Sequence, residues 1–242
     1  TARYATAVRR RLGLAMPSRV ERGAGVSATA AALVDVELAA RLILVGAITD
    51  ALDGIVARRR GSTPAGVYLD SLADVASFGI APAVLVVAVV FETWMLADAT
   101  ALFVCGVSLP ALFVAMAITR LGMYTAYDYD SEVTEGVQTT LAATILAAAV
   151  LAGYTAVWQL VGLIGVLAAL MVTTITYPDL HAQDALIMGI VQAGAVVAPG
   201  YYGRIFAFAL LFLSLAYLTL APRFYWRDHL DSDWLKSTLG EN

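Results

Sequence analysis

Four aspartates stand in two short pairs within a stretch of the chain that is otherwise mostly apolar. Asp50 and Asp53 are three residues apart, and Asp70 and Asp74 are four residues apart. On a helix, both separations place the two side chains on one face, about one turn apart. Two facing helices could therefore direct four carboxylates towards one place. Oxygen ligands of this kind select hard divalent cations, Mg²⁺ or Mn²⁺.

A metal site built from histidine or cysteine side chains is not expected near the aspartates. His181 and His229 fall near predicted loops far from the aspartates, and the single cysteine, Cys105, lies in an apolar run. A disulfide framework and a cysteine-rich metal site are both excluded. Two cations held by carboxylates suit phosphoryl transfer, because they neutralise and orient a diphosphate. The aspartates therefore predict a two-metal site for a phosphate-containing substrate.

The composition is that of an integral membrane protein. Of 242 residues, 60% are hydrophobic and 14% are charged, and the mean hydropathy is +0.79, whereas soluble domains carry roughly 25% charged residues. A carboxylate within a membrane is costly and by default marks a functional site. The formal net charge of −4 gives no reason to expect a nucleic-acid partner.

Long apolar segments predict an all-α fold, a bundle of about eight transmembrane helices with a range of six to eight. The first segment, 17–35, is the weakest, because only its second half is apolar. The predicted spans after it are 38–60, 66–91, 97–123, 134–153, 156–176, 184–198 and 202–220.

Three regions are expected along the chain. Residues 1–16 are basic and amphipathic, which predicts a helix lying on the membrane surface. Residues 17–222 form the transmembrane domain, and residues 223–242 form a cytoplasmic tail. With the N-terminus inside, every basic residue except Arg41 and Arg204 falls on the cytoplasmic side, as the positive-inside rule requires. We therefore expect a multi-pass protein of the cell membrane whose aspartates face the cytoplasm.

The residues around the aspartates fit a phosphate-bearing ligand. Gly54 and Gly66 have no side chain to block a close approach, and Ala57 keeps its turn slim. Arg58 offers a planar guanidinium fork that suits phosphate oxygens, although a membrane anchor is the simpler alternative for an arginine here. Together these residues outline a pocket for a metal-bound nucleotide diphosphate.

This pattern, D-x2-D-G-x2-A-R followed by Gly66 and D-x3-D, resembles the signature of the CDP-alcohol phosphotransferase family, with a loop one residue shorter than usual. The resemblance implies attack of an alcohol on the lipid-side phosphorus of a CDP-linked lipid, with release of CMP. It also implies a homodimer. By the same resemblance, the four aspartates hold the metals and Asp74 is also the general base. The expected CDP-binding residues are Gly54, Ala57, Arg58 and Gly66.

The acceptor is expected to be L-serine. The positions after Asp70 and Asp74 are Ser71 and Val75, similar to the phosphatidylserine synthase branch, whereas the glycerol-phosphate branch usually has Pro and Lys there. Arg120 matches an arginine of the serine branch and would pair with the serine carboxylate or a phosphate; a membrane anchor is its alternative. Met123 departs from the branch pattern.

Other functions stay open at this stage. Inositol phosphate and glycerol phosphate are alternative acceptors for the same chemistry. A cation transporter is a remote alternative, since carboxylates on one side of the membrane beside Arg58 do not line a path across it.

The donor lipid is a further expectation from composition. Lys236 is the only lysine, and all other basic residues are arginine. An acidic, lysine-poor chain is typical of a salt-loving organism, for which the donor would be CDP-archaeol and the product archaetidylserine. A GC-rich genome would also favour arginine, and CDP-diacylglycerol is then the donor.

Overall fold

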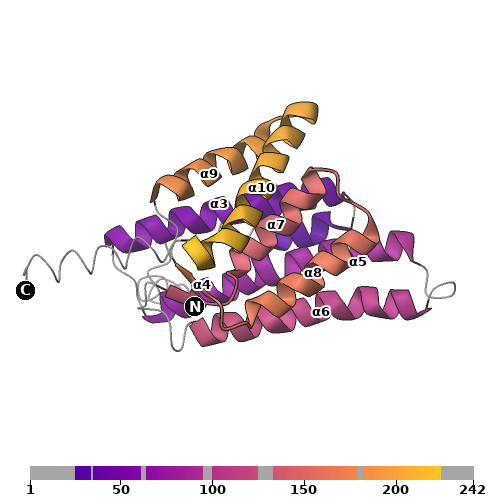
Figure 1. Cartoon of the computed structure of the whole chain (residues 1–242), viewed down its shortest axis with the longest axis horizontal. Coiled ribbons are helices and arrows are strands. Elements are labelled where there is room, and N and C mark those ends of the chain that lie inside the picture. Colours follow the sequence, from indigo (N-terminus) through magenta and orange to yellow (C-terminus); the bar gives the residue numbers. More distant parts are fainter. Residues whose placement is uncertain are drawn as a thin grey trace, which may run out of the picture.

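The structure is a computed structural model that describes residues 25–33, 35–60, 64–94, 100–124, 133–178 and 182–224. The predicted surface helix 1–16 and nearly all of the predicted tail 223–242 lie outside these residues. Of the weak first span, the described part is helical over residues 25–31. The rest of the described chain is a bundle of helices with one pair of short strands (Figure 1).

The helices occupy the positions at which long apolar runs predict them. α4, the π-helix η1 and α5 follow one another without a break and make up the span predicted over 66–91. In chain order the helices are α3 (Val36–Arg60), α4 (Pro64–Asp74), η1 (Val75–Ile80), α5 (Ala81–Thr93), α6 (Thr100–Met123), α7 (Thr139–Leu151), α8 (Val157–Met171), α9 (Ala182–Val197) and α10 (Gly200–Phe224).

Several of these helices have the length and hydropathy of membrane spans. In the described part of the chain, Tyr68–Thr93, Thr100–Met123 and Gly200–Pro222 are long and apolar enough to cross a membrane. α7, α8 and α9 are apolar but shorter, and α3 is long but carries charged residues in both halves. The fold is that of a helical membrane protein, and the count of eight spans stays a prediction.

Two strands correct two of the predicted helix boundaries. β1 (Val133–Glu135) and β2 (Thr176–Pro178) pair antiparallel, where helices were predicted to begin at 134 and to end at 176. The run 172–176, VTTIT, is rich in β-branched residues, which favour extended backbone. Gly136 has a φ of 75°, a conformation that no helix contains. Helix α7 consequently begins only at Thr139.

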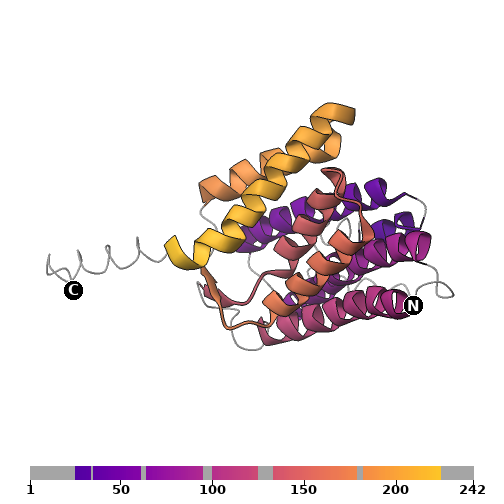
Figure 2. The same cartoon turned by 45° about the vertical axis from the view of Figure 1, so that its right-hand side comes forward.

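The core of the bundle is built around α7. Every side chain from residue 141 to residue 150 is buried, because α7 packs against α3, α10, η1 and α8. Many of these residues are alanines, which allow neighbouring helices to approach closely within a membrane. Figures 1 and 2 show α9 and α10 along one edge of the bundle and α6 beside α8 along the other.

One buried polar contact joins α3 to α9. The Gln192 side-chain amide donates a hydrogen bond of 2.9 Å to the Leu44 backbone carbonyl, in a buried position. A polar side chain in an apolar bundle needs such a partner, because no water is present to replace it.

The bundle has two ends that differ in their charged residues. We call the end at which α3 finishes and α4 begins the aspartate end. The opposite end, at which α3 begins, α7 and α9 finish and α10 begins, is called the far end. Both are visible along the horizontal axis of Figure 1.

Candidate active site

The first aspartate pair lies in the second half of α3. Asp50 and Asp53 are both half-buried, and the two carboxylate oxygens of Asp53 are shielded from solvent. Their spacing places them one turn apart on the same helix face. The helical prediction for this segment is confirmed, so the pair has the geometry that the sequence indicates.

The second pair lies on α4, a helix of 11 residues whose last residue is Asp74. The Asp70 side chain is exposed, whereas Asp74 is half-buried and its Oδ1 is shielded from solvent. No basic residue lies in the last turn of α4. The more accessible carboxylate is therefore Asp70, and Asp74 is held in the wall of the bundle.

The two pairs come into the same neighbourhood. Asp50 lies close enough to Asp70, on the other helix, and to Asp53 for the carboxylate charges to repel one another. Like charges in a partly buried place are unfavourable without a counter-charge. All four aspartates are among the described residues, and in this part of the chain no three acidic, histidine or cysteine side chains are close enough to hold a metal ion as they stand. Their role as ligands stays a prediction.

The predicted CDP-binding residues lie near these pairs along α3 and α4. Gly54 directly follows Asp53 in α3, and Gly66 lies in the first turn of α4; both are half-buried. Ala57 and Arg58 belong to the last turns of α3, and their side chains lie outside the described residues. The backbone thus places all four positions beside the break between α3 and α4.

Arg120 lies near the end of α6, a helix that packs against both α4 and η1. Its side chain is only 7% exposed, and its guanidinium carbon stands 5.7 Å from the centre of the Tyr124 ring, within the range of a cation–π contact. An arginine that anchors a helix at a membrane surface extends into water. The buried Arg120 lacks the exposure of such an anchor, and its role in binding a substrate stays a prediction.

The π-helix η1 directly after Asp74 was not predicted. The Ala81 backbone N–H donates to the Ala76 carbonyl, five residues back, and Pro82 follows in the first turn of α5. In a regular α-helix the ring of Pro82 would meet the carbonyl four residues earlier. A wider turn relieves that clash, and such turns are frequent at functional sites. Pro82 is the signal in the sequence that could have revealed it.

Ser77 in η1 is a second residue that the sequence reasoning missed. It is fully buried, and a Cβ on Gly25 would lie 2.5 Å from its hydroxyl oxygen. The helix over residues 25–31 therefore packs directly against the turn that follows Asp74. Gly25 leaves the space for this contact, so the first helix supports the position of the second aspartate pair.

The chain is similar to known proteins over much of its length. The chain matches the model of the CDP-alcohol phosphatidyltransferase family over residues 20–175, more than half of its 242 residues. It is 47% identical over 73 residues to CDP-diacylglycerol–serine O-phosphatidyltransferase of Saccharomyces cerevisiae, covering 29% of this chain and 26% of that protein. It is 28% identical over 147 residues to archaetidylserine synthase of Methanothermobacter thermautotrophicus, covering 60% of this chain and 59% of that protein.

The chain thus spans about a quarter and about three fifths of the lengths of these two relatives. The family match, by contrast, runs from residue 20 to residue 175 and includes both aspartate pairs, η1 and Arg120. The chain belongs to the CDP-alcohol phosphatidyltransferase family.

Proposed function

We propose that the protein transfers a phosphatidyl-type group from a CDP-lipid to the hydroxyl of L-serine and releases CMP. The observation that carries this proposal is the approach of Asp50 to Asp70 across two helices, within the region that matches the family. The two relatives, whose names specify serine, support serine as the acceptor. One of them is named for an archaetidyl product, which supports CDP-archaeol as the donor beside CDP-diacylglycerol.

Asp74 is proposed as the general base. It takes the proton of the serine hydroxyl while the hydroxyl oxygen attacks the lipid-side phosphorus. A new P–O bond to serine forms, the P–O bond to the bridging oxygen breaks, and that oxygen leaves with CMP. A carboxylate is a plausible proton acceptor when it is aligned with the hydroxyl. The partial burial of Asp74 at the end of α4 supports this role.

Asp50, Asp53, Asp70 and Asp74 are proposed to hold Mg²⁺ or Mn²⁺, two ions in all. Members of the family generally depend on a divalent metal. The donors are all carboxylates, which fits these ions, and the repulsion of Asp50 by Asp53 and Asp70 is of the kind that a bound cation relieves. When bound, the metals neutralise the diphosphate and stabilise the leaving oxygen.

The remaining site residues are assigned to the two substrates. Gly54, Ala57 and Gly66 leave room for the CDP moiety, and Arg58 pairs with its phosphate oxygens. Arg120 pairs with the carboxylate of serine or with a phosphate. The buried position of Arg120 beside η1 supports this assignment.

The proposed setting is the cell membrane, with the aspartate end towards the cytoplasm. A soluble acceptor and a membrane-bound donor can meet at that surface. The excess of basic residues expected on this side supports the orientation, and membrane lipids surround the bundle. We further propose that the protein acts as a homodimer, which rests on the family alone.

The test follows CMP release by the purified chain with CDP-lipid and Mg²⁺ or Mn²⁺, offering serine, inositol phosphate or glycerol phosphate in turn. We expect turnover with serine, and turnover only with another alcohol would overturn the assignment of serine as the acceptor.

The role of Asp74 as the base is tested by substitution. Asp74→Asn is expected to lower kcat by about 10²- to 10⁴-fold. Asp35→Asn is the matched control, since asparagine also caps a helix and Asp35 caps α3 at the far end. Full activity in Asp74→Asn would remove it as the base.

A further inference from the structure

A second polar site lies at the far end of the bundle. A cavity of about 390 Å³ lies there between α3, α7, α9 and α10. Its lining includes Glu37 and Arg41 of α3 and Tyr201 and Arg204 of α10. Arg41 and Arg204 are the two basic residues that the predicted topology leaves on the other side of the membrane. The structure brings them to one cavity although they lie far apart in the chain.

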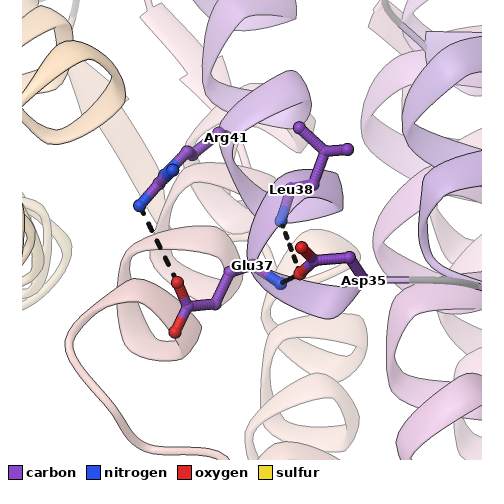
Figure 3. A network of polar contacts seen from close by, with 4 residues as sticks. All are labelled: Asp35, Glu37, Leu38 and Arg41. Carbon is purple, nitrogen blue, oxygen red and sulfur yellow. Dashed lines mark hydrogen bonds and ion pairs between the residues drawn. The ribbon is translucent and has the colours of Figure 1, made fainter. Parts of the chain in front are cut away.

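Arg41 has hydrogen-bonding capacity to spare. Its Nη2 stands 3.7 Å from Oε2 of Glu37, one turn earlier (Figure 3), but Glu37 is 65% exposed, and an exposed pair of this kind is weak. The Nε of Arg41 is buried and has no hydrogen-bond partner in the described part of the chain. A buried donor without a partner is unfavourable, so an acceptor oxygen in the cavity would be stabilised there.

Arg204 brings a second guanidinium, on an exposed side chain that lies against Gly153. A Cβ on Gly153, just after α7, would stand 2.8 Å from Nη2 of Arg204 and 3.2 Å from its Cζ. Gly153 has a φ of 97°, which other residues rarely adopt. Among the described residues Arg204 makes no ion pair. The cavity therefore carries two positive charges and one negative charge.

The beginning of α10 adds backbone donors to the same cavity. Gly200 and Gly203 line it, and the first N–H groups of a helix have no partner within the helix. Pro199, directly before α10, has no side-chain acceptor to cap them. α3 starts differently, because Oδ1 of Asp35 accepts hydrogen bonds from the backbone of Glu37 and Leu38, as Figure 3 shows. The N-terminal end of a helix binds phosphate readily.

We propose that this far-end cavity binds a phosphate group, held by Arg41, Arg204 and the first turn of α10. Guanidinium forks match phosphate oxygens in two-point contacts. The phosphate is that of a phospholipid headgroup or free inorganic phosphate. Tyr201 and Tyr202 are exposed beside the cavity, as tyrosines are at the surface of a membrane, which favours the headgroup. This site is separate from the one at which the CDP-lipid is proposed to react.

The experiment measures thermal unfolding of the full chain in a maltoside detergent as each probe is titrated. The probes are inorganic phosphate, dioleoylphosphatidylglycerol and, as a lipid without phosphate, dioleoylglycerol. A ligand that binds the folded state raises the Tm. Arg204→Gln is expected to weaken binding of the phosphate-bearing probe about tenfold or more. Glu37→Gln is expected to tighten it severalfold, because it removes the competing carboxylate.

Glu92→Gln is the matched control for Glu37→Gln. Glu92 is exposed near the end of α5, at the same end of the bundle but outside the cavity, so the same change of charge is expected to leave binding unchanged. Arginine-dependent binding of phosphatidylglycerol alone assigns the headgroup as the source. Arginine-dependent binding of phosphate as well supports the site with either source.

Three results would overturn the proposal: equal binding by Arg204→Gln and the original chain, an equal response to dioleoylglycerol, or equal tightening by the two glutamate variants. If Arg204→Gln does not fold, Arg204→Lys takes its place, with a weaker loss expected because lysine keeps the charge but not the fork. The Glu37→Gln result tests the proposal independently of both.

Discussion

The aspartate pairs and the far-end cavity are clusters of charged residues at the two ends of the bundle, and helix α3 contributes to both. Near its beginning, Arg41 lines the far-end cavity with Arg204; in its second half, Asp50 and Asp53 meet Asp70 of α4. In each place side chains of like charge are gathered, and like charges repel one another. Charge clusters in a membrane protein are therefore informative about ligands: the aspartate pairs fit divalent cations, and the pair of arginines fits phosphate.

Removing metal should produce the largest effect and would show whether the two ends are independent. Dialysis against a chelator is expected to abolish CMP release, because the carboxylates then have no cation with which to hold a diphosphate. Adding Mg²⁺ or Mn²⁺ back should restore it. Binding of phosphate at the far end, followed by Tm, should not change. Undiminished turnover after chelation would contradict the acidic site, and a parallel loss of phosphate binding would contradict the separation of the ends.

Replacing one arginine at each end tests which end of the bundle binds the acceptor, serine. Arg120→Lys keeps the charge but loses the two-point fork, and should raise the KM for serine about tenfold or more while changing the KM for CDP-lipid less. Steady-state kinetics with each substrate varied in turn gives both values. The matched change at the far end, Arg204→Lys, should leave both KM values unchanged. Equal effects of the two variants would remove Arg120 from the acceptor site.

The smallest effect is expected for a substitution in the middle of the bundle, and the quantity affected is the stability of the fold. Gln192→Leu removes the buried hydrogen bond to the Leu44 carbonyl, which lies between Arg41 and the aspartates on α3. Hydrogen bonds between membrane helices contribute about 0.5–1.5 kcal/mol, so the free energy of unfolding should fall by that amount. Unfolding in mixed detergent micelles measures it. Gln159→Leu in α8, a half-buried position, serves as control and should change stability less.

Much of the architecture follows from the sequence because apolar length is a strong signal. α6 and α10 begin and end within a few residues of their predicted limits. The strands were missed since the β-branched run 172–176 continues an apolar helix without a polar break. The π-helix was missed because hydropathy does not record the backbone clash that Pro82 would cause.

Some features of the site could likewise be predicted from the sequence, and others could not. The spacing of the aspartates predicts their faces on each helix, because that is a local property. Whether the four carboxylates close into one metal site depends on how α3 and α4 are placed, which no local pattern contains. Arg41 and Arg204 stood out in the sequence only as exceptions to a charge bias. Their meeting depends on the packing of α10 beside α7 and α9.

The π-turn after Asp74 has a consequence for how this span can change over evolutionary time. Each residue of an α-helix turns the chain by about 100°. The wider turn in η1 therefore changes the direction in which the acidic face of α4 points relative to the apolar face of α5. Substitutions in α5 can then be accepted without rotating Asp70 and Asp74. Deleting one residue of η1 would instead turn one face against the other, so this segment should tolerate changes of residue type far better than changes of length.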